Sequence, residues 1–485
     1  MLAGLRELFE VPWVQWVGFG LILCVHLAGL LAGVYVLMTG RTSQGVVGWI
    51  LGLWLLPEIS LILFIFFGPR KFYGYVTAHR RGKEALDRLT TKLARSLEAM
   101  GCASPPARGE FKALENLARL PFTAGNTLRL LIDGEAGFGA MFEAIREAKH
   151  YVLVQFYIVR DDALGRELKL LLLEKCREGV AVYFLYDPVG SYQLPRAYER
   201  GLRDGGVKVF SFNRIHFIKN RYKINFRNHR KIIVTDGDVA FVGGLNVGEE
   251  YLGRNDYFGR WRDTMVRVEG PAVMSIQHCF LEDWYWASGL IPEWNWTPRP
   301  GCAGAHVLTL PTGPADELET CGLTFIHAIH SAQKRIWITS PYFVPDGAVV
   351  AALQLAVMRG VDVRILIPEK VDHRLVYLAS FAYLEETVGC GMKLYRYTAG
   401  FMHQKVILVD DAVAAVGTAN LDNRSFRINF ELFVVCLEQG FVAEVRQMLE
   451  HDFAESRLVS VDEFRSRSFA FRLLVRVVRL LAPVL

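Results

Sequence analysis

The sequence predicts an α/β protein made of two similar halves, each with a mixed sheet, behind an N-terminal hairpin of two transmembrane helices. Three observations lead to this prediction. Two long apolar runs open the chain. From Asn126 onward, patterns typical of strands and helices alternate, and the succession then returns. One short motif, His-x-Lys-x-x-x-x-Asp, occurs once in each half.

Composition limits the class of protein. A length of 485 residues permits two or three domains with ample core. The hydrophobic share of 52% exceeds that of most soluble proteins, and the excess is concentrated at the N-terminus. The net charge of +5 demands neither a nucleic acid nor a strongly acidic partner. The eight cysteines are scattered, without Cys-x-x-Cys or zinc spacing, so we expect a reducing compartment and no structural metal.

The first element is a membrane hairpin, residues 1–68, with spans at about 11–38 and 46–67. The first apolar run is too long for the core of a signal peptide, and the second follows at once. Glu58 lies within the second span, where a carboxylate is a functional suspect. We favour the simpler interpretation, in which Glu58 packs against the first span near His26.

Basic residues predict the orientation of the hairpin. They gather after the second span, whereas the link between the spans offers only Arg41. The positive-inside rule then places both the bulk of the chain and the N-terminus in the cytoplasm. The residues concerned are Arg70, Lys71, Arg80, Arg81, Lys83 and Arg88. Residues 69–125 are expected to form a helical connector, broken at Ser104-Pro105-Pro106.

The two halves, residues 126–300 and 301–460, follow with the same order of elements. In the first we expect helices at Phe138–Lys149 and Gly165–Glu178 and strands at Tyr151–Tyr157 and Val180–Tyr186. In the second we expect helices at Leu323–Ala332 and Ala348–Arg359 and strands at Arg335–Ser340 and Val361–Ile367. The repeat is roughly 170 to 185 residues long, which is too long for a solenoid. It indicates a duplicated α/β unit.

The duplicated motif carries the chemistry. Its copies are His229, Lys231 and Asp236, then His403, Lys405 and Asp410. Residues two apart on a strand share a face, so each histidine has its lysine beside it. Each copy is followed by Gly-x-x-Asn, which adds backbone N–H groups and an amide: Gly243-Gly244-Leu245-Asn246 and Gly417-Thr418-Ala419-Asn420. One match would be weak evidence, but two with the same sequel are strong evidence for a phosphate site.

Two imidazoles suit phosphodiester exchange at one site between the halves. One can attack phosphorus, giving a phospho-histidine, while the other protonates the departing alkoxide. Lys231 and Lys405 would neutralise the non-bridging oxygens. Phosphate binding is expected from Gly243, Asn246, Thr418 and Asn420. The residues alone leave the roles of the two histidines interchangeable.

Each histidine also needs a carboxylate to hold its other ring nitrogen. We expect Asp263 to serve the histidine of the first half and Glu431 that of the second. Asp236 and Asp410 stand an odd number of positions from their histidines and would face away from them. Asp236-Gly237 resembles a hairpin turn, so a structural role is favoured for these two aspartates.

The paired motifs with their Gly-x-x-Asn sequels resemble the HKD motifs of the phospholipase D superfamily, over about residues 126–455. The apolar N-terminus, Tyr186-Asp187-Pro188-Val189-Gly190-Ser191, Asn228-His229-Arg230-Lys231 and the closing Leu480-Leu481-Ala482-Pro483-Val484-Leu485 are similar to bacterial cardiolipin synthases in particular. The resemblance implies two phospholipase D-like domains and no cofactor. It also implies transfer of a phosphatidyl group between two phosphatidylglycerol molecules, with release of glycerol.

The family pattern makes both motif triads catalytic, including Asp236 and Asp410, and by analogy His229 is the nucleophile and His403 the acid. The superfamily often has Ser after the motif glycine, where this chain has Gly244 and Thr418. The implied partners are phosphatidylglycerol and anionic membrane lipid, with no nucleic acid. The implied location is the bacterial inner membrane, as a multi-pass protein with cytoplasmic catalytic domains. The oligomeric state is left open.

Three other functions fit the same residues. Hydrolysis by a phospholipase D, or transfer to another alcohol, would use the same site. A catalytically inactive lipid-binding protein would need a decayed motif, and both motifs are intact. A nuclease is disfavoured by the two spans.

Two basic segments flank this chemistry. Asn213–Lys231 is either a solvated loop or a patch that attracts anionic headgroups. Residues 461–485 are expected to form a basic amphipathic helix carrying Arg472, Arg476 and Arg479, either at the membrane interface or packed with its arginines exposed.

Overall fold

The computed structural model describes residues 12–40, 43–68, 88–103, 111–212, 226–299 and 304–482. The chain divides into two compact units. The first contains Met1–Thr77 and Ile215–Asn225, and the second contains Ala78–Arg214 and Phe226–Leu485. The predicted basic segment falls largely on residues 213–225, outside the described residues, as do Arg70 to Lys83 and the predicted break at Ser104-Pro105-Pro106.

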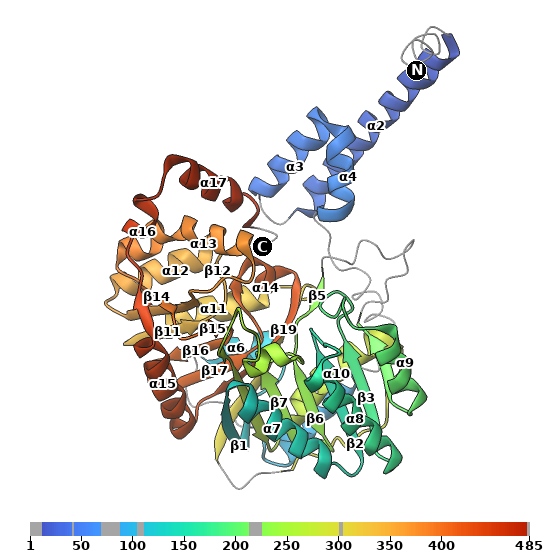
Figure 1. Ribbon diagram of the computed structural model, residues 1–485, viewed down its shortest axis with the longest axis vertical. Coiled ribbons are helices and arrows are strands. Elements are labelled where there is room, and N and C mark those ends of the chain that lie inside the picture. Colours follow the sequence, from blue (N-terminus) through green and yellow to red (C-terminus); the bar gives the residue numbers. More distant parts are fainter. Residues whose placement is uncertain are drawn as a thin grey trace. The chain divides into compact units, whose positions relative to one another are not determined.

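The first unit consists of α2 (Pro12–Thr39), α3 (Ser43–Leu55) and α4 (Pro57–Phe67) (Figure 1). Within the described residues, one helix is long and apolar enough to cross a bilayer. Its apolar part, Trp16–Thr39, has 24 residues and is about 36 Å long, against a hydrocarbon core of about 30 Å. The apolar stretch of α3 is shorter.

The second predicted span, at about 46–67, contains two helices rather than one, because the helix breaks at Leu56. Pro57 has no N–H to continue the hydrogen-bond ladder. Beyond it, α4 doubles back: the rings of Trp49 and Phe64 are 5.4 Å apart, whereas a straight helix would separate them by about 22 Å. His26 Nδ1 lies 3.9 Å from Glu58 Oε1, which confirms that Glu58 packs near His26.

A glycine of α2 allows the close approach of this break. A Cβ at Gly29 would lie 2.4 Å from the carbonyl oxygen of Leu53 and 3.0 Å from Cβ of Pro57. In a continuous helix the Leu53 carbonyl would accept a hydrogen bond from the N–H of residue 57. Proline has no N–H, so this carbonyl lacks its helical donor. A small residue is therefore required where α2 crosses the bend between α3 and α4.

The second unit opens with a helical stretch at 88–99 and with α6 (Lys112–Ala118), which lie in the described parts of the predicted connector. The first half then contains β1 (Thr123–Ile132), α7 (Asp133–Glu147), β2 (Tyr151–Phe156), α8 (Ala163–Arg177), β3 (Ala181–Tyr186), α9 (Arg196–Asp204), β4 (Lys208–Ser211), β5 (Arg227–Asn228), β6 (Ile232–Thr235), β7 (Val239–Gly243), the 3-10 turn η3 (Glu249–Leu252), β8 (Trp261–Arg262), β9 (Thr264–Glu269) and α10 (Ala272–Ser288).

The second half repeats this order. It contains β10 (Ala305–Thr312), α11 (Thr320–Ser331), β11 (Arg335–Thr339), β12 (Phe343–Val344), α12 (Gly347–Met358), β13 (Asp362–Pro368), α13 (Arg374–Thr387), η4 (Val388–Cys390), β14 (Lys393–Tyr397), β15 (Phe401–Met402), β16 (Val406–Val409), β17 (Val413–Gly417), β18 (Leu421–Asp422), α14 (Asn423–Arg427), β19 (Asn429–Cys436), α15 (Gln439–Ala454) and β20 (Ser456–Leu458).

The prediction of two similar mixed-sheet halves is confirmed. In the first half β2 is parallel to β3 and antiparallel to β6, and in the second β11 is parallel to β13 and antiparallel to β16. The two sheets join through the antiparallel pairs β1–β10 and β10–β19 into one 16-stranded sheet (Figure 1). Each half has its own buried apolar cluster against the sheet.

Two short strands cross from one half to the other. β5, which directly precedes His229, pairs with β19 of the second half. β15, which directly precedes His403, pairs with β8 of the first half. These exchanges place the start of each motif against the opposite half.

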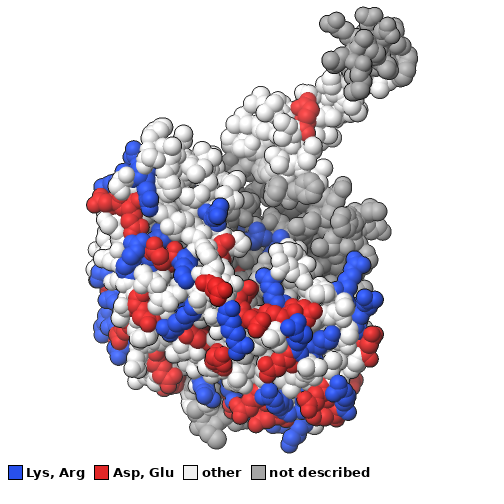
Figure 2. Space-filling model, in the orientation of Figure 1, with Lys and Arg blue, Asp and Glu red and all other residues white. Residues whose placement is uncertain are grey.

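The C-terminal segment forms α16 (Asp462–Arg465) and α17 (Phe469–Arg479). α17 packs through buried Val475 and Val478, and its last two arginines pair with α13: Arg476 with Glu385 at 2.8 Å and Arg479 with Glu386 at 2.7 Å. Its opposite face is apolar and exposed, and its outer surface is mostly uncharged in Figure 2. That face consists of Phe469, Leu473, Leu474, Val477, Leu480 and Leu481.

Candidate active site

The two motif histidines are held by backbone hydrogen bonds to the opposite half. The N–H of His229 donates to the Phe430 carbonyl at 2.9 Å, continuing the β5–β19 pair. The N–H of His403 donates to the Arg262 carbonyl at 2.8 Å, continuing the β8–β15 pair. Both side chains are nearly buried. The exchanged strands thus fix both rings at the junction of the halves.

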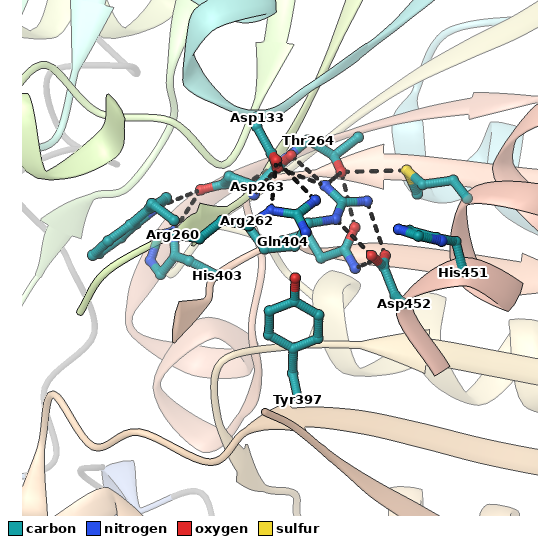
Figure 3. Close-up of polar contacts among 12 residues, drawn as sticks. Asp133, Arg260, Arg262, Asp263, Thr264, Tyr397, His403, Gln404, His451 and Asp452 are labelled. Carbon is teal, nitrogen blue, oxygen red and sulfur yellow. Dashed lines mark hydrogen bonds and ion pairs between the residues drawn. The ribbon is translucent and has the colours of Figure 1, made fainter. Parts of the chain in front are cut away.

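The carboxylates that hold the histidines are crossed between the halves, so the predicted pairing is wrong. His229 Nδ1 lies 2.9 Å from Glu431 Oε2, and His403 Nδ1 lies 2.8 Å from Asp263 Oδ2 (Figure 3 shows the second pair). The cause is the strand exchange, because β5 runs beside β19, which carries Glu431, and β15 runs beside β8, which ends just before Asp263. Pairing within each half would need strands that are not neighbours.

This arrangement determines which ring nitrogen is available. A carboxylate on Nδ1 leaves Nε2 of each histidine as the atom that can attack or protonate. Burial lowers the pKa of His229 to about 4, although the charge of Glu431 opposes it. Burial and then Lys405 lower the pKa of His403 to about 4. Both imidazoles are therefore neutral at neutral pH.

The motif lysines share this electrostatic site. Lys231 Nζ donates to the carbonyl of His229 at 2.5 Å, and Lys405 donates to that of His403. Burial lowers the pKa of both lysines, that of Lys405 to about 8. Each lysine also lowers the pKa of the histidine in the other half, so the four side chains form one cluster.

The residues predicted to bind phosphate have protein partners of their own. Asn246 accepts a hydrogen bond from the Ile158 N–H at 3.0 Å and donates one to the Tyr251 hydroxyl at 3.0 Å. The Thr418 hydroxyl donates to Glu431 at 2.6 Å. Asn246 and Thr418 thus brace the site, whereas the side-chain oxygen of Asn420 is buried and has no hydrogen-bond partner among the residues that the structure describes.

Gly243 has a steric role. A Cβ at this position would lie 2.3 Å from the carbonyl oxygen of Thr264 on the adjacent strand. Its counterpart Gly417 would place a Cβ 2.5 Å from the carbonyl oxygen of Leu432. Both glycines thus permit close strand packing beside the site.

Asp236 and Asp410 cap turns, as favoured from the sequence. Asp236 accepts hydrogen bonds from the backbone N–H groups of residues 149, 150 and 151 at 2.7 to 2.8 Å. Asp410 accepts equivalent bonds from residues 333, 334 and 335. Both have positive φ, 55° and 53°, which aspartate tolerates in a turn. Each aspartate ties the hairpin after its motif to the start of the neighbouring strand.

The sequence did not reveal the buried ion pairs formed by residues next to the motif histidines. Arg230 donates to Asp283 of α10 at 2.9 Å and to the Glu431 carbonyl at 3.0 Å. Arg262 donates to Asp452 of α15 at 2.7 and 2.8 Å, and Gln404 donates to the same carboxylate at 2.7 Å (Figure 3). The available signal was an aspartate in the last helix of each half, Asp283 and Asp452.

One family of domains matches both halves. The family described as "Cardiolipin synthase, PLD-like domain" matches residues 141–284 and 325–453. Among the described residues, no group of three or more His, Cys, Asp or Glu side chains lies close enough together to hold a metal ion.

Full-length relatives are similar to the whole chain. Cardiolipin synthase A of Pseudomonas entomophila is 46% identical over 468 residues, covering 96% of this chain and 98% of the relative. Cardiolipin synthase A of Pseudomonas aeruginosa strain LESB58 is 47% identical over 468 residues, covering 96% of each. The crystal structure of a phosphatidylserine synthase from Haemophilus influenzae superposes with a TM-score of 0.56 at 17% identity, covering 78% of this chain and 100% of that one, which shows a shared fold.

Proposed function

This chain belongs to the cardiolipin synthase family with phospholipase D-like domains, and from that premise we propose that it moves a phosphatidyl group from one phosphatidylglycerol to another, releasing glycerol. The observation that carries the proposal is the pair of buried imidazoles, each with Nδ1 on a carboxylate of the opposite half. Two such rings, flanked by Lys231 and Lys405, can supply both the nucleophile and the group that gives and takes the proton in a phosphodiester exchange.

In the first step, Nε2 of His229 attacks the phosphorus of the donor lipid. The N–P bond forms, the P–O bond to glycerol breaks, and the leaving alkoxide takes a proton from Nε2 of His403. In the second step, the glycerol hydroxyl of the acceptor lipid gives its proton to His403 and attacks phosphorus, and the N–P bond breaks. The histidines return to their starting states, and the products are cardiolipin and glycerol.

The negative charge of the donor phosphate favours the protonated form of His403, which the first step requires. Burial and the two lysines hold the pKa of His403 at about 4. A phosphodiester anion between the lysines offsets their positive charge and so raises the pKa of His403. Protonation of the acid is thereby coupled to binding of the substrate.

The experiment supplies phosphatidylglycerol in vesicles to the full-length protein and identifies the products. Cardiolipin together with an equal amount of free glycerol is the expected result. Hydrolysis is the competing reaction, because water can replace the acceptor alcohol in the second step. Phosphatidic acid as the only phospholipid product would overturn the proposal in favour of a phospholipase.

We propose further that α2 crosses the inner membrane and that the catalytic unit lies on its cytoplasmic side. The basic residues after α4 support this orientation. Protease protection of a C-terminal tag in intact spheroplasts is the expected result, and cleavage from outside would contradict it. An N-terminal tag tests the bend at Leu56: a tag exposed outside means that α3 and α4 return within the bilayer, whereas a protected tag means that they complete a second crossing.

We also propose that the apolar face of α17 enters the interfacial region of the bilayer. Leu473 and Val477 are 53% and 52% exposed on this face, while Arg476 and Arg479 are engaged with α13. A spin label at Leu473→Cys in proteoliposomes should show the oxygen accessibility of lipid, and a matched label at Leu170→Cys, on α8, that of water. Water-like accessibility at both positions would exclude the contact.

A further inference from the structure

A cavity lies in the second half where β12, the end of β13 and the start of α13 meet. Buried Phe343 and Ile367 form its apolar part. The side chain of His373 is 69% exposed, so the cavity is open to solvent on that side. Its polar lining residues are Tyr342, Lys370, Asp372, His373, Tyr377 and Ser380.

One wall of the cavity is joined to the second motif through β12. In the pairing of β12 with β18, Phe343 lies opposite Leu421, the residue that follows the motif asparagine Asn420. The Ser340 hydroxyl links the two segments, because it accepts from the Leu421 N–H at 2.9 Å and donates to the Tyr342 carbonyl at 2.8 Å. Tyr342 is thus held beside the end of the second motif.

Another wall, the loop between β13 and α13, is joined to the rings around His403. Lys370 Nζ donates to the carbonyls of Tyr257 and Phe258 at 3.0 and 2.9 Å. The Phe258 ring lies 5.4 Å from the Trp261 ring, and the Trp261 ring lies 5.3 Å from the His403 ring. Both walls therefore connect the cavity to the part of the catalytic centre that holds His403.

The carboxylate of Asp372 can accept further hydrogen bonds. It accepts from the Tyr342 hydroxyl at 2.5 Å and from the His373 N–H at 2.7 Å. A carboxylate can accept about four hydrogen bonds, so about two remain for a ligand. A phosphate oxygen has no hydrogen to donate, and the carboxylate repels its negative charge. The cavity therefore suits a ligand with neutral hydroxyl groups.

Asn420, on the same side of the catalytic centre, offers a second acceptor. Its Nδ2 donates to Asp422 at 3.4 Å, which leaves its side-chain oxygen to face elsewhere. That oxygen is buried and has no hydrogen-bond partner among the described residues. A buried acceptor without a donor is unfavourable, and a hydroxyl of a ligand would satisfy it.

We propose that this cavity binds the glycerol head group of phosphatidylglycerol, an inference that rests on the proposed function. In the first step the P–O bond to this glycerol breaks, and its alkoxide takes the proton of His403. The remaining hydroxyls of the glycerol donate to Asp372 and Asn420. Tyr342 holds the Asp372 carboxylate in place. Water and alcohols with one hydroxyl lack these donors, so the cavity favours a polyol.

Two reactions of the full-length protein test this site. Exchange of radiolabelled glycerol into phosphatidylglycerol vesicles reverses the first step and uses the cavity. Release of p-nitrophenol from a phosphatidyl p-nitrophenol substrate involves no glycerol. In Asp372→Ala, we expect glycerol exchange to fall about tenfold more than p-nitrophenol release, with the loss in the KM for glycerol rather than in kcat. Tyr342→Phe keeps the ring and removes the hydroxyl, so the same ratio should change less.

Two control variants separate ligand binding from the position of the loop. Tyr257→Phe removes the hydrogen bond from the Tyr257 hydroxyl to the Val371 carbonyl, 3.0 Å long, and leaves the polar side chains of the cavity in place. Asp161→Ala removes a carboxylate that pairs with Arg166 in the first half. Neither variant should change the ratio of the two reactions.

Four results would contradict the glycerol site or its premise. An equal loss of both reactions in Asp372→Ala would overturn the site, because the residue would then serve the fold or the donor phosphate. An unchanged ratio in both Asp372→Ala and Tyr342→Phe would overturn it as well. A loss confined to exchange of choline would make the cavity an ammonium site. Absence of glycerol exchange in the wild-type protein would instead refute the proposed function, so the two failures are distinguishable.

Discussion

In the first half of the catalytic unit, residue 244 is glycine and the carboxylate beside it is Asp263. In the second half, the equivalent residues are Thr418 and Glu431. A Cβ at Gly244 would lie 1.9 Å from Oδ1 of Asp263, whereas the Thr418 hydroxyl donates to Glu431 at 2.6 Å. The shorter aspartate keeps its carboxylate close to its own strand and occupies the space of a side chain at 244. The longer glutamate leaves room for a hydroxyl.

The carboxylates also differ in how many donors share them. Glu431 accepts from Ser425 at 3.0 Å and Asn429 at 3.1 Å, as well as from Thr418 and His229. Asp263 accepts from the Thr264 N–H at 2.8 Å, from Trp261 Nε1 at 3.4 Å and from His403. Glu431 therefore holds more neighbouring side chains in place than Asp263 does. Each carboxylate raises the pKa of its histidine against the effect of burial.

The largest expected effect tests whether the halves form one site. His229→Ala and His403→Ala should each reduce cardiolipin formation by about 10⁴-fold, because each step needs both imidazoles. Radiolabelled product formation measures the loss, and an unchanged thermal unfolding midpoint shows that the variants are folded. If each variant instead kept about half of the activity, each half would be an independent site, and the two carboxylates would not serve one shared reaction.

A smaller effect separates the roles of the two carboxylates. Glu431→Gln and Asp263→Asn should each slow cardiolipin formation by about 100-fold, since each leaves its histidine poorly oriented. A substrate with a p-nitrophenolate leaving group needs no acid, so it should restore cleavage in Asp263→Asn and leave Glu431→Gln impaired. Release of p-nitrophenol measures this. If p-nitrophenol release were restored in Glu431→Gln alone, His229 would be the acid and His403 the nucleophile.

Substitutions beside the two carboxylates should lower the free energy of unfolding by different amounts. Gly244→Ala should destabilise the fold by about 1 to 3 kcal/mol, because its Cβ would overlap Asp263. Thr418→Ala should destabilise it by about 1 kcal/mol, through the loss of one hydrogen bond to a buried carboxylate. Thermal unfolding in detergent compares the two variants. If Thr418→Ala lost more stability than Gly244→Ala, Asp263 would be able to move away from residue 244.

The smallest expected effect is a pH dependence to which both halves contribute. The pKa values of His229 and His403 are about 4 in the folded protein, below the ordinary histidine value of about 6.5. Between these values the unfolded chain binds more protons, so the free energy of unfolding falls as pH drops from about 6.5 towards 4. Unfolding midpoints at pH 7 and pH 5 measure the slope. Each His→Ala variant should have a shallower slope, and a slope equal to that of the wild type would mean that the rings are not buried as neutral groups.

Much of the architecture followed from local patterns. The alternation of strands and helices, the duplication and the long apolar helix were all predicted, because a strand or a helix imprints its own period on the sequence. The motif histidines and lysines were recognisable because their spacing within one strand is fixed by backbone geometry. Asp236 and Asp410 were assigned to turns for the same reason.

Contacts between distant segments were decided only by the tertiary structure. Glu431 is 202 positions from His229, and Asp263 is 140 positions from His403, so the pairing depends on which strand lies beside which. The reversal at Leu56 depends on packing against α2, and the pairing of Arg476 and Arg479 depends on the position of α13. Periodicity along the chain determines which face of a helix or strand is apolar. Which other element covers that face depends on the free energy of the whole folded chain.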